Sequence, residues 1–486
     1  MSDEPRSTGE RACCEPRPRC GEAFDLAILG GGSAAFAAAR RASELGARVL
    51  LVNEGPIGGT CVNVGCVPSK TLIRAAENHH QHGLSRFRGL AAEPGRVDFA
   101  ELIREKTELV AELRQAKYVD ALDALPGVEL VPGRGSLRSR HEIAVGDAVF
   151  RAEKILIATG ARPSHPPIPG LADAGVWDST SAMEATKLPR ELVVLGGRYV
   201  ALELGQMFAR LGSRVTVVQR SEQILPGEDP DLASSLTDCL AREGLAILTG
   251  QQVARVARDA SGFELEVRRA GSAEKLRADA VLAALGRAPN TAGIGLEALG
   301  VERAPNGTVV VKDDLETNVP GIYAAGDVIG EPAYVYAAAY EGGLAAENAL
   351  TGAATPRDYT AIPWVVFTDP QVAGVGWNER EAAAAGIAVD VSRLPLAQVP
   401  RALAARDTRG FVKLLRARGE DRLVGARILA PEGGEQIIEA SLMIKFGLPV
   451  SAVMRHFHPY LTQSEAVKLA ALGFDRDVAK LSCCAQ

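Results

Sequence analysis

A glycine-rich turn between an apolar strand and a helix occurs twice in this sequence, about 166 residues apart, and it restricts the fold more than any other feature. The first copy joins a strand at 25–30 to the turn GGGSAA, an alanine-rich helix and a strand at 48–52. The second joins a strand at 191–195 to the turn GGRYVA, a helix through Arg210 and a strand at 214–218. Units of this kind bind dinucleotides in α/β sheets. The sequence therefore predicts two nucleotide-binding domains.

The residues within each turn indicate what it binds. Gly30 and Gly32 fit the pattern G-x-G-x-x-A, whose glycines let backbone N–H groups approach a pyrophosphate at the helix N-terminus. The second turn departs from this pattern, because Arg198 stands where the middle glycine is expected. The strand after it ends in Gln219 and Arg220, with no acid for a ribose hydroxyl but an arginine suited to a phosphate. We expect NADPH rather than NADH there, unless Arg220 is only a solvated surface residue.

The string GGTCVNVGCVPSK at 58–70 carries the most specific chemistry. Its cysteines, Cys61 and Cys66, are separated by four residues and can close a small redox-active disulfide ring, whose thiolates a helix N-terminus stabilises. Zinc is the alternative, but a zinc site requires two further ligands in a paired spacing, and none lies nearby in the sequence. The string favours redox chemistry.

Composition excludes several classes of function. The chain has 486 residues, long enough for about three domains, and a net charge of −6 with mixed signs, so nucleic acid is not an expected partner. The longest early apolar stretch, 26–39, contains glycines and is too short to span a membrane, which takes about 20 apolar residues. Residues 1–22 lack the apolar segment of a signal peptide, and we expect a flexible tail and a cytoplasmic protein.

These motifs, together with the segment YAAGD at 323–327, resemble the flavin-dependent pyridine nucleotide–disulfide oxidoreductases over nearly the whole chain from Phe24. The resemblance implies that the first turn holds FAD and the second NADPH. It also implies a homodimer, and an α/β fold with two Rossmann-like nucleotide-binding domains followed by a C-terminal α+β dimerisation domain. The expected boundaries are 1–22 for the tail, 23–160 and 286–358 for the FAD domain, 161–285 for the NADPH domain and 359–486 for the dimerisation domain.

Local patterns predict the elements outside the two turns. A helical stretch is expected at 99–125, ending before a proline. The last domain is expected to contain strands at 364–367, 410–415 and 423–429 and helices at 434–446 and 464–471.

The resemblance also implies roles for individual residues. Cys61 is the thiol that meets the substrate, Cys66 is the thiolate beside the flavin, and Lys70 and Glu203 form an ion pair near the flavin and nicotinamide. Tyr199 matches an aromatic gate over the flavin. The residues implied in cofactor binding are Gly30, Gly32, Ser33, Ala34, Ala35, Asn53, Glu54, Gly59, Thr60, Lys70, Thr159, Gly160, Gly196, Tyr199, Gln219, Arg220, Gly286, Gly326 and Asp327. Either Asn53 or Glu54 holds the FAD ribose.

Two adjacent cysteines, Cys483 and Cys484, stand two residues before the end of the sequence. A disulfide between neighbours is strained, whereas paired thiolates suit a soft metal ion. The alternative is a frayed tail with incidental thiols. The run from His458 to the end, the string at 58–70 and the run at 112–122 resemble the members of the family that reduce mercuric ion.

That resemblance implies a route for the metal. Cys483 and Cys484 of one subunit collect Hg(II) and pass it by thiol exchange to Cys61 and Cys66 of the other subunit. NADPH reduces FAD, which reduces the ion to elemental mercury. The phenols expected beside the metal are those of Tyr118 and, from the partner subunit, Tyr460.

His458 leaves an alternative open. In disulfide-reducing members of the family, a glutamate five residues after such a histidine orients it, but Gln463 stands there and the nearest acid is Glu465. A histidine without its carboxylate is a weaker proton relay. A dihydrolipoamide dehydrogenase or glutathione-type reductase therefore remains an alternative to mercury reduction.

The other cysteines suggest a different class of function. A non-catalytic, thiol-rich metal-binding protein would explain Cys13, Cys14 and Cys20 together with the C-terminal pair, but not the two nucleotide turns. We expect those three to belong to a disordered leader rather than to a scavenging tail. Cys239, in a helical stretch, is expected to be a small buried hydrophobe.

Overall fold

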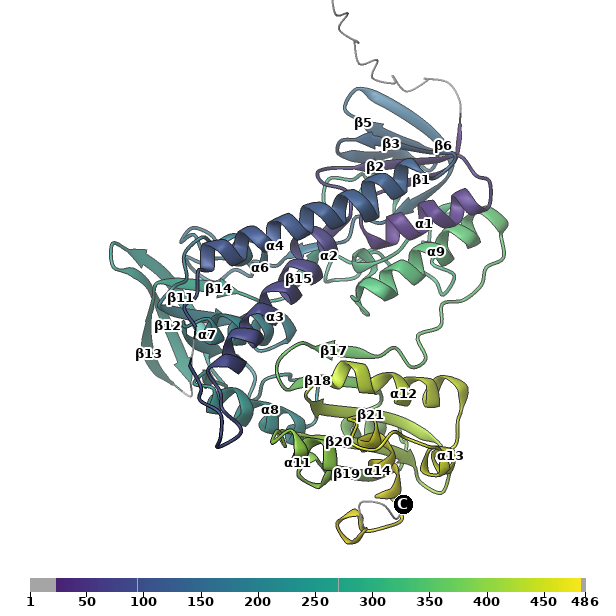
Figure 1. The fold of residues 1–486 in the computed structure, drawn as a ribbon. Coiled ribbons are helices and arrows are strands. Elements are labelled where there is room, and N and C mark those ends of the chain that lie inside the picture. Colours follow the sequence, from purple (N-terminus) through teal and green to yellow (C-terminus); the bar gives the residue numbers. More distant parts are fainter. Residues whose placement is uncertain (1–22, 94, 270, 482–486) are drawn as a thin grey trace, which may run out of the picture.

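The structure, a computed structural model, describes residues 23–93, 95–269 and 271–481, and Figure 1 shows them as three connected regions. The cysteines that lie outside the described residues are Cys13, Cys14, Cys20, Cys483 and Cys484.

The first region is built on a seven-stranded sheet in the order β3-β2-β1-β6-β5-β4, with β16 also paired to the long strand β6. The first four strands of that order run parallel, and Leu26, Leu50 and Leu51 are fully buried because the sheet is covered on both faces. The strands are β1 (Phe24–Leu29), β2 (Val49–Asn53), β3 (Val128–Pro132), β4 (Gly135–Ser139), β5 (Glu142–Val145), β6 (Ala148–Ile157) and β16 (Ile322–Ala324).

Two long helices, α1 (Ser33–Glu44) and α9 (Val335–Thr351), lie side by side against this sheet (Figure 1). Their close approach depends on Gly342, since a Cβ atom there would lie 2.0 Å from the carbonyl oxygen of Ala34. The packing fixes the N-terminus of α1 at the carboxyl end of β1, where a parallel sheet places its ligands.

The second region repeats the plan with a four-stranded parallel sheet in the order β10-β9-β8-β14. An antiparallel sheet, β11-β12-β13, packs against it through an apolar cluster that includes Val193, Val218, Phe263 and Leu265. The short strands β7 and β15 pair at the junction with the first region. The elements are β7 (Ala161–Pro163), α6 (Ser179–Glu184), β8 (Glu191–Leu195), α7 (Tyr199–Arg210), β9 (Arg214–Val218), α8 (Pro230–Arg242), β10 (Ala246–Leu248), β11 (Gln252–Asp259), β12 (Gly262–Arg269), β13 (Ser272–Ala278), β14 (Ala280–Ala283) and β15 (Arg287–Pro289).

The C-terminal region has an antiparallel five-stranded sheet in the order β17-β18-β21-β20-β19. Helices α12 and α14 cover it, and Ile428, Ile437 and Val467 share one apolar cluster. The elements are β17 (Trp364–Val366), β18 (Gln371–Gly376), α10 (Glu379–Ala384), β19 (Val389–Pro395), α11 (Pro400–Ala404), β20 (Phe411–Ala417), β21 (Leu423–Ala430), α12 (Gly433–Phe446), α13 (Val450–Arg455) and α14 (Glu465–Leu472).

The connection from β2 to β3 is helical and carries the two cysteines of the 58–70 string. Its elements are α2 (Gly59–Val64), α3 (Cys66–His82), α4 (Phe99–Arg114), a π-helical turn (Gln115–Val119) and α5 (Asp120–Asp123). Helix α3 runs from the first region to pack against α7 of the second (Figure 1).

The strands and helices expected from the sequence are confirmed, with ends within about two residues of the observed ones. The sequence analysis did not anticipate the π-helical turn or the antiparallel sheet of the second region. No helix in the described part of the chain is long and apolar enough to cross a membrane.

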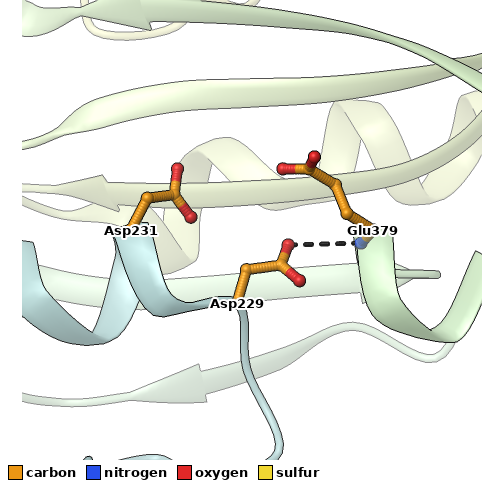
Figure 2. Close-up of side chains that lie close together, drawn as sticks. All are labelled: Asp229, Asp231 and Glu379. Atoms are coloured by element: carbon orange, nitrogen blue, oxygen red, sulfur yellow. Dashed lines mark hydrogen bonds between the residues drawn. The ribbon is translucent and has the colours of Figure 1, made fainter.

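A buried ammonium group joins the second region to the C-terminal one. The carboxylates of Asp229, Asp231 and Glu379 face one another at the starts of α8 and α10 (Figure 2), close enough to hold a metal ion. Lys413 of β20, whose side chain is 0% exposed, places Nζ 3.2, 2.6 and 2.8 Å from these three carboxylates. Burial alone would lower the pKa of Lys413, but its hydrogen bonds to Asp231 and Glu379 raise it above the ordinary value. Lysine therefore supplies the cation of this cluster.

Replacing Lys413 with Met should lower the free energy of unfolding by about 3 kcal/mol, because three facing carboxylates would lose their shared cation. Chemical denaturation followed by circular dichroism measures the change. Lys312→Met is the matched control, since the ammonium group of Lys312 is exposed and its pair with Glu316 is screened by water, so its loss should change the free energy of unfolding far less. Equal effects of the two substitutions would contradict the assignment.

Candidate active site

The two thiols lie at a junction between helices. Cys61 is inside α2, and Cys66 is the first residue of α3, where the helix N-terminus favours a thiolate. Both are free thiols in this structure. Hydrogen bonding from Cys61, assisted by the positive charge of Lys70, lowers the pKa of Cys66 to about 7, and the same bond raises the pKa of Cys61. Cys66 is thus the thiolate of the pair near neutral pH.

Lys70 stands one turn after Cys66 on α3, and its ammonium group is held from two sides. Its Nζ lies 2.6 Å from Oε2 of Glu203 on α7 and 4.5 Å from the ring centre of Phe367. The other oxygen of Glu203 accepts a hydrogen bond of 2.9 Å from the Phe367 backbone N–H. Lys70 and Glu203 therefore form the ion pair that the sequence analysis expected.

A cavity of about 540 Å³, the first cavity, opens beside the thiols and extends over the first glycine turn. Gly30 adopts a φ of +121°, and a Cβ atom there would lie 2.2 Å from the carbonyl oxygen of Ala158, so only glycine fits. The predicted residues that line this cavity are Gly30, Gly32, Ser33, Ala34, Asn53, Glu54, Gly59, Thr60, Cys61, Cys66, Lys70, Thr159, Gly160, Glu203, Gly326 and Asp327. Ala35, also on α1, does not line the cavity, because its side chain is fully buried in the apolar core of the first region.

The end of β2 separates the roles of its two polar residues. The side-chain amide of Asn53 donates to the carbonyl oxygen of Gly55, and its carbonyl group packs on Gly31. The Glu54 side chain is exposed, lines the first cavity and makes no hydrogen bond to another described residue. At the other wall, burial raises the pKa of Asp327, and Arg287 lies 3.5 Å from its carboxylate.

A second cavity, of about 710 Å³, lies at the glycine turn of the second region. The predicted residues Gly196, Gln219, Arg220 and Gly286 line it. Ser179, Val200 and Arg287 line both cavities, so the two adjoin. Tyr199 lines neither, because its ring stacks on that of Trp364, with the ring centres 5.8 Å apart.

Comparison with known proteins gives this arrangement its family. The family profile "Pyridine nucleotide-disulphide oxidoreductase" matches residues 24–342, and its dimerisation-domain profile matches residues 362–471. The chain belongs to the pyridine nucleotide-disulphide oxidoreductase family. The family and the fold class expected from the sequence are confirmed.

The similar proteins within this family include mercuric reductases. The chain is 46% identical to a mercuric reductase of Streptomyces lividans, over 95% of this chain and 98% of that protein. It is 42% identical to one from Staphylococcus aureus, over 95% of this chain and 84% of the relative. Among solved structures, the HOCl-induced flavoprotein disulfide reductase RclA from Escherichia coli superposes with a TM-score of 0.81, at 31% identity, over 91% of this chain and 98% of that one.

Pyridine nucleotide-disulphide oxidoreductases of this kind are enzymes that use FAD and NADPH, which confirms the cofactors expected from the sequence. The residues present fit both cofactors. Gly30 and Gly196 form the same tight turn, with φ of +121° and +112°, at the N-terminus of a helix, and a Cβ atom at either would meet a backbone carbonyl. Helix N-termini of this kind accept a pyrophosphate.

The two tyrosines expected beside the metal lie in different regions. Tyr118 is in the π-helical turn, and its ring is 3.3 Å from the position of a Cβ atom on Gly58. Burial, with a smaller effect from Cys61, raises its pKa. Tyr460 is half-exposed on the segment between α13 and α14.

The expectation that His458 lacks an orienting carboxylate is wrong. Its Nε2 lies 2.8 Å from Oε1 of Glu439 on α12, and the imidazole is only 6% exposed. The orienting glutamate does not follow the histidine in the sequence but precedes it by 19 residues.

Two other predictions about cysteines have outcomes. Cys239 is buried in α8, as expected, and burial raises the pKa of its thiol. Within the described residues, the groups of His, Cys, Asp and Glu that could hold a metal comprise only the Asp229 cluster, so no third ligand joins Cys61 and Cys66. The zinc alternative therefore lacks its ligands in the described part of the chain.

Replacing Cys61 with Ala should raise the pKa of Cys66 above about 7, because the hydrogen bond that stabilises its thiolate is lost. Only the thiolate is alkylated, so the midpoint of the pH–rate profile for iodoacetamide, followed on the Cys66 peptide by mass spectrometry, should move upward. Cys239→Ala serves as the control. An unchanged midpoint would mean that Lys70 alone sets the pKa.

Proposed function

We propose that this enzyme reduces Hg(II) to elemental mercury with electrons from NADPH. The observation that carries the proposal is the dithiol of Cys61 and Cys66, with one thiolate near neutral pH, on the wall of the first cavity. Mercuric ion is soft and is satisfied by two thiolates. The identity of 42–46% to curated mercuric reductases over about 95% of the chain supports this substrate.

The overall reaction is NADPH + Hg(II) → NADP⁺ + H⁺ + Hg(0), in which the nicotinamide is oxidised by two electrons and the metal is reduced by two. FAD, when bound, supplies the two-electron relay between them. The chain supports that relay by placing the two cavities side by side, with Val200 and Arg287 on the walls of both. Elemental mercury has little affinity for thiolates and leaves the site.

The residues around the dithiol have roles in this proposal. Lys70 stabilises the thiolate of Cys66 and is itself fixed by Glu203. Glu54, rather than Asn53, holds the FAD ribose, because the amide of Asn53 is already bonded to the turn. The phenol of Tyr118 is assigned a place beside the metal that the thiols hold, because its ring lies against Gly58, three residues before Cys61.

Delivery of the metal is assigned to Cys483 and Cys484, which lie outside the described residues. Adjacent thiols bind Hg(II) at once and pass it to a second pair by exchange, so the ion is not released between the two sites. The receiving pair is in the partner subunit, next to that subunit's own cavities. Tyr460 is assigned to the same partner site.

A dimer is required for this delivery, and the C-terminal region supports one. The dimerisation-domain profile covers residues 362–471. Helix α12 presents Ile438, Leu442 and Phe446, four residues apart on one face, with 48%, 47% and 69% of each residue exposed. Such a stripe on a surface helix marks a protein contact.

Mercury turnover tests the function directly. In excess thiol, the reduced enzyme should oxidise NADPH only when Hg(II) is added. Cys61→Ala should lower the rate of this oxidation at least about 100-fold, because one of the two thiolates that bind the metal is lost. Cys239→Ala, which changes a buried thiol outside the site, should retain it. Faster oxidation with lipoamide or glutathione disulfide than with Hg(II) would contradict the proposal.

The tail is tested in the same assay. The double substitution Cys483→Ala/Cys484→Ala should slow turnover when external thiol is scarce and leave it nearly normal when thiol is abundant. Unchanged turnover at low thiol would exclude the delivery role.

The dimer predicts a further outcome. Replacing Leu442 with Glu should shift the enzyme to a monomer in analytical ultracentrifugation, since a charge would be buried in the apolar contact. Leu90→Glu, at a residue 64% exposed in another region, is the control. A dimer that survives Leu442→Glu would place the interface elsewhere.

A further inference from the structure

We propose that Arg198 binds the pyrophosphate of NADPH with its side chain, in the position where the glycine turn of the first region has Gly32. This deepens the proposed function, because it rests on NADPH occupying the second cavity. It concerns the one residue of that turn that departs from the glycine pattern.

The two turns have the same backbone. A Cβ atom on Gly30 would lie 2.2 Å from the carbonyl oxygen of Ala158, and one on Gly196 would lie 2.4 Å from that of Ala284. The residue before each helix is extended, with φ −89° and ψ −168° at Gly32 and φ −107° and ψ −168° at Arg198. These angles suit any residue, so the arginine is held without strain.

The space around the two positions differs. In the first region the backbone of α2 lies beside the turn, since a Cβ atom on Gly32 would lie 3.7 Å from the Cα atom of Gly59. A long side chain at Gly32 would have to pass this backbone. In the second region Arg198 is exposed and lines the second cavity, which leaves room for its guanidinium group.

The charges of the second cavity point to an anion. Three arginines line it, and Arg287 lies 3.5 Å from Asp327. Arg198 and Arg220 both line the cavity, and neither makes an ion pair with an acid of the described residues. Two cations without an anionic partner in one cavity favour a ligand with several phosphates.

The positions of these two arginines assign them to different phosphates. Arg198 stands at the N-terminus of α7, where a Rossmann unit receives the pyrophosphate. Arg220 follows the end of β9, where such a unit meets the 2′ position of the adenosine ribose. Arg198 should therefore contribute equally to NADP⁺ and NAD⁺, and Arg220 to NADP⁺ alone.

The decisive variant is Arg198→Gly, which restores the glycine pattern of the first turn. Equilibrium titration of the FAD-loaded enzyme with NADP⁺ and with NAD⁺ gives both dissociation constants without turnover. Loss of a charge-assisted phosphate contact should raise both dissociation constants by the same factor, about tenfold to a hundredfold. Arg220→Ala should raise the dissociation constant of NADP⁺ by a similar factor and leave that of NAD⁺ unchanged.

The outcomes separate the inference from the function on which it rests. A wild-type enzyme that binds neither nucleotide would refute the proposed function. If wild type binds NADP⁺ and Arg198→Gly binds both nucleotides as tightly as wild type does, Arg198 does not contact the pyrophosphate and the inference is overturned. If Arg198→Gly weakens NADP⁺ alone, the pyrophosphate assignment is overturned. Arg198→Lys, which retains a charge without the planar fork, should give intermediate constants for both nucleotides.

Discussion

The site depends on two contacts that the carboxylate of Glu203 makes. One oxygen lies 2.6 Å from the ammonium group of Lys70 on α3, and the other accepts the backbone N–H of Phe367 next to β17. The Glu203 side chain is only 6% exposed and that of Lys70 is 33% exposed, so water screens the ion pair only in part. One side chain of the second region thus fixes the redox helix of the first region and the start of the C-terminal region. The Lys70 cation held there assists the hydrogen bond from Cys61 in lowering the pKa of Cys66.

Buried ion pairs also join the regions elsewhere. Arg210 of α7 lies 2.7 Å from Glu243 and 2.8 Å from Asp369, which precedes β18, and Arg427 lies 2.5 Å from Glu228. Such pairs add little stability compared with apolar packing, because desolvation offsets the attraction, but removal of one partner is costly. The pairs Arg210–Asp369 and Arg427–Glu228 form in only one relative orientation of the second and C-terminal regions. They fix the second region against the C-terminal region more than they increase the free energy of unfolding.

Much of the fold was predictable because its signals are local. The strands and glycine turns of both nucleotide units follow from hydrophobic runs and from Gly30 and Gly196, whose backbone angles other residues cannot adopt without strain. The partner of His458 was not predictable in this way. Glu439 lies on another element, and local spacing carries no information about a contact between a helix and a distant segment. The same reason applies to the three carboxylates around Lys413.

The sequence by itself determined the chemistry available: two dinucleotide turns, a dithiol at the start of a helix, and a second dithiol near the end of the sequence. These features lie within short segments whose geometry is set by neighbouring residues. Only the tertiary structure decided how they meet. It brought Lys70 to Glu203 across 133 positions, placed the two cavities side by side, and left Tyr199 stacked on Trp364 outside both of them. Contacts between distant segments depend on how whole regions pack, and that packing is a property of the complete chain.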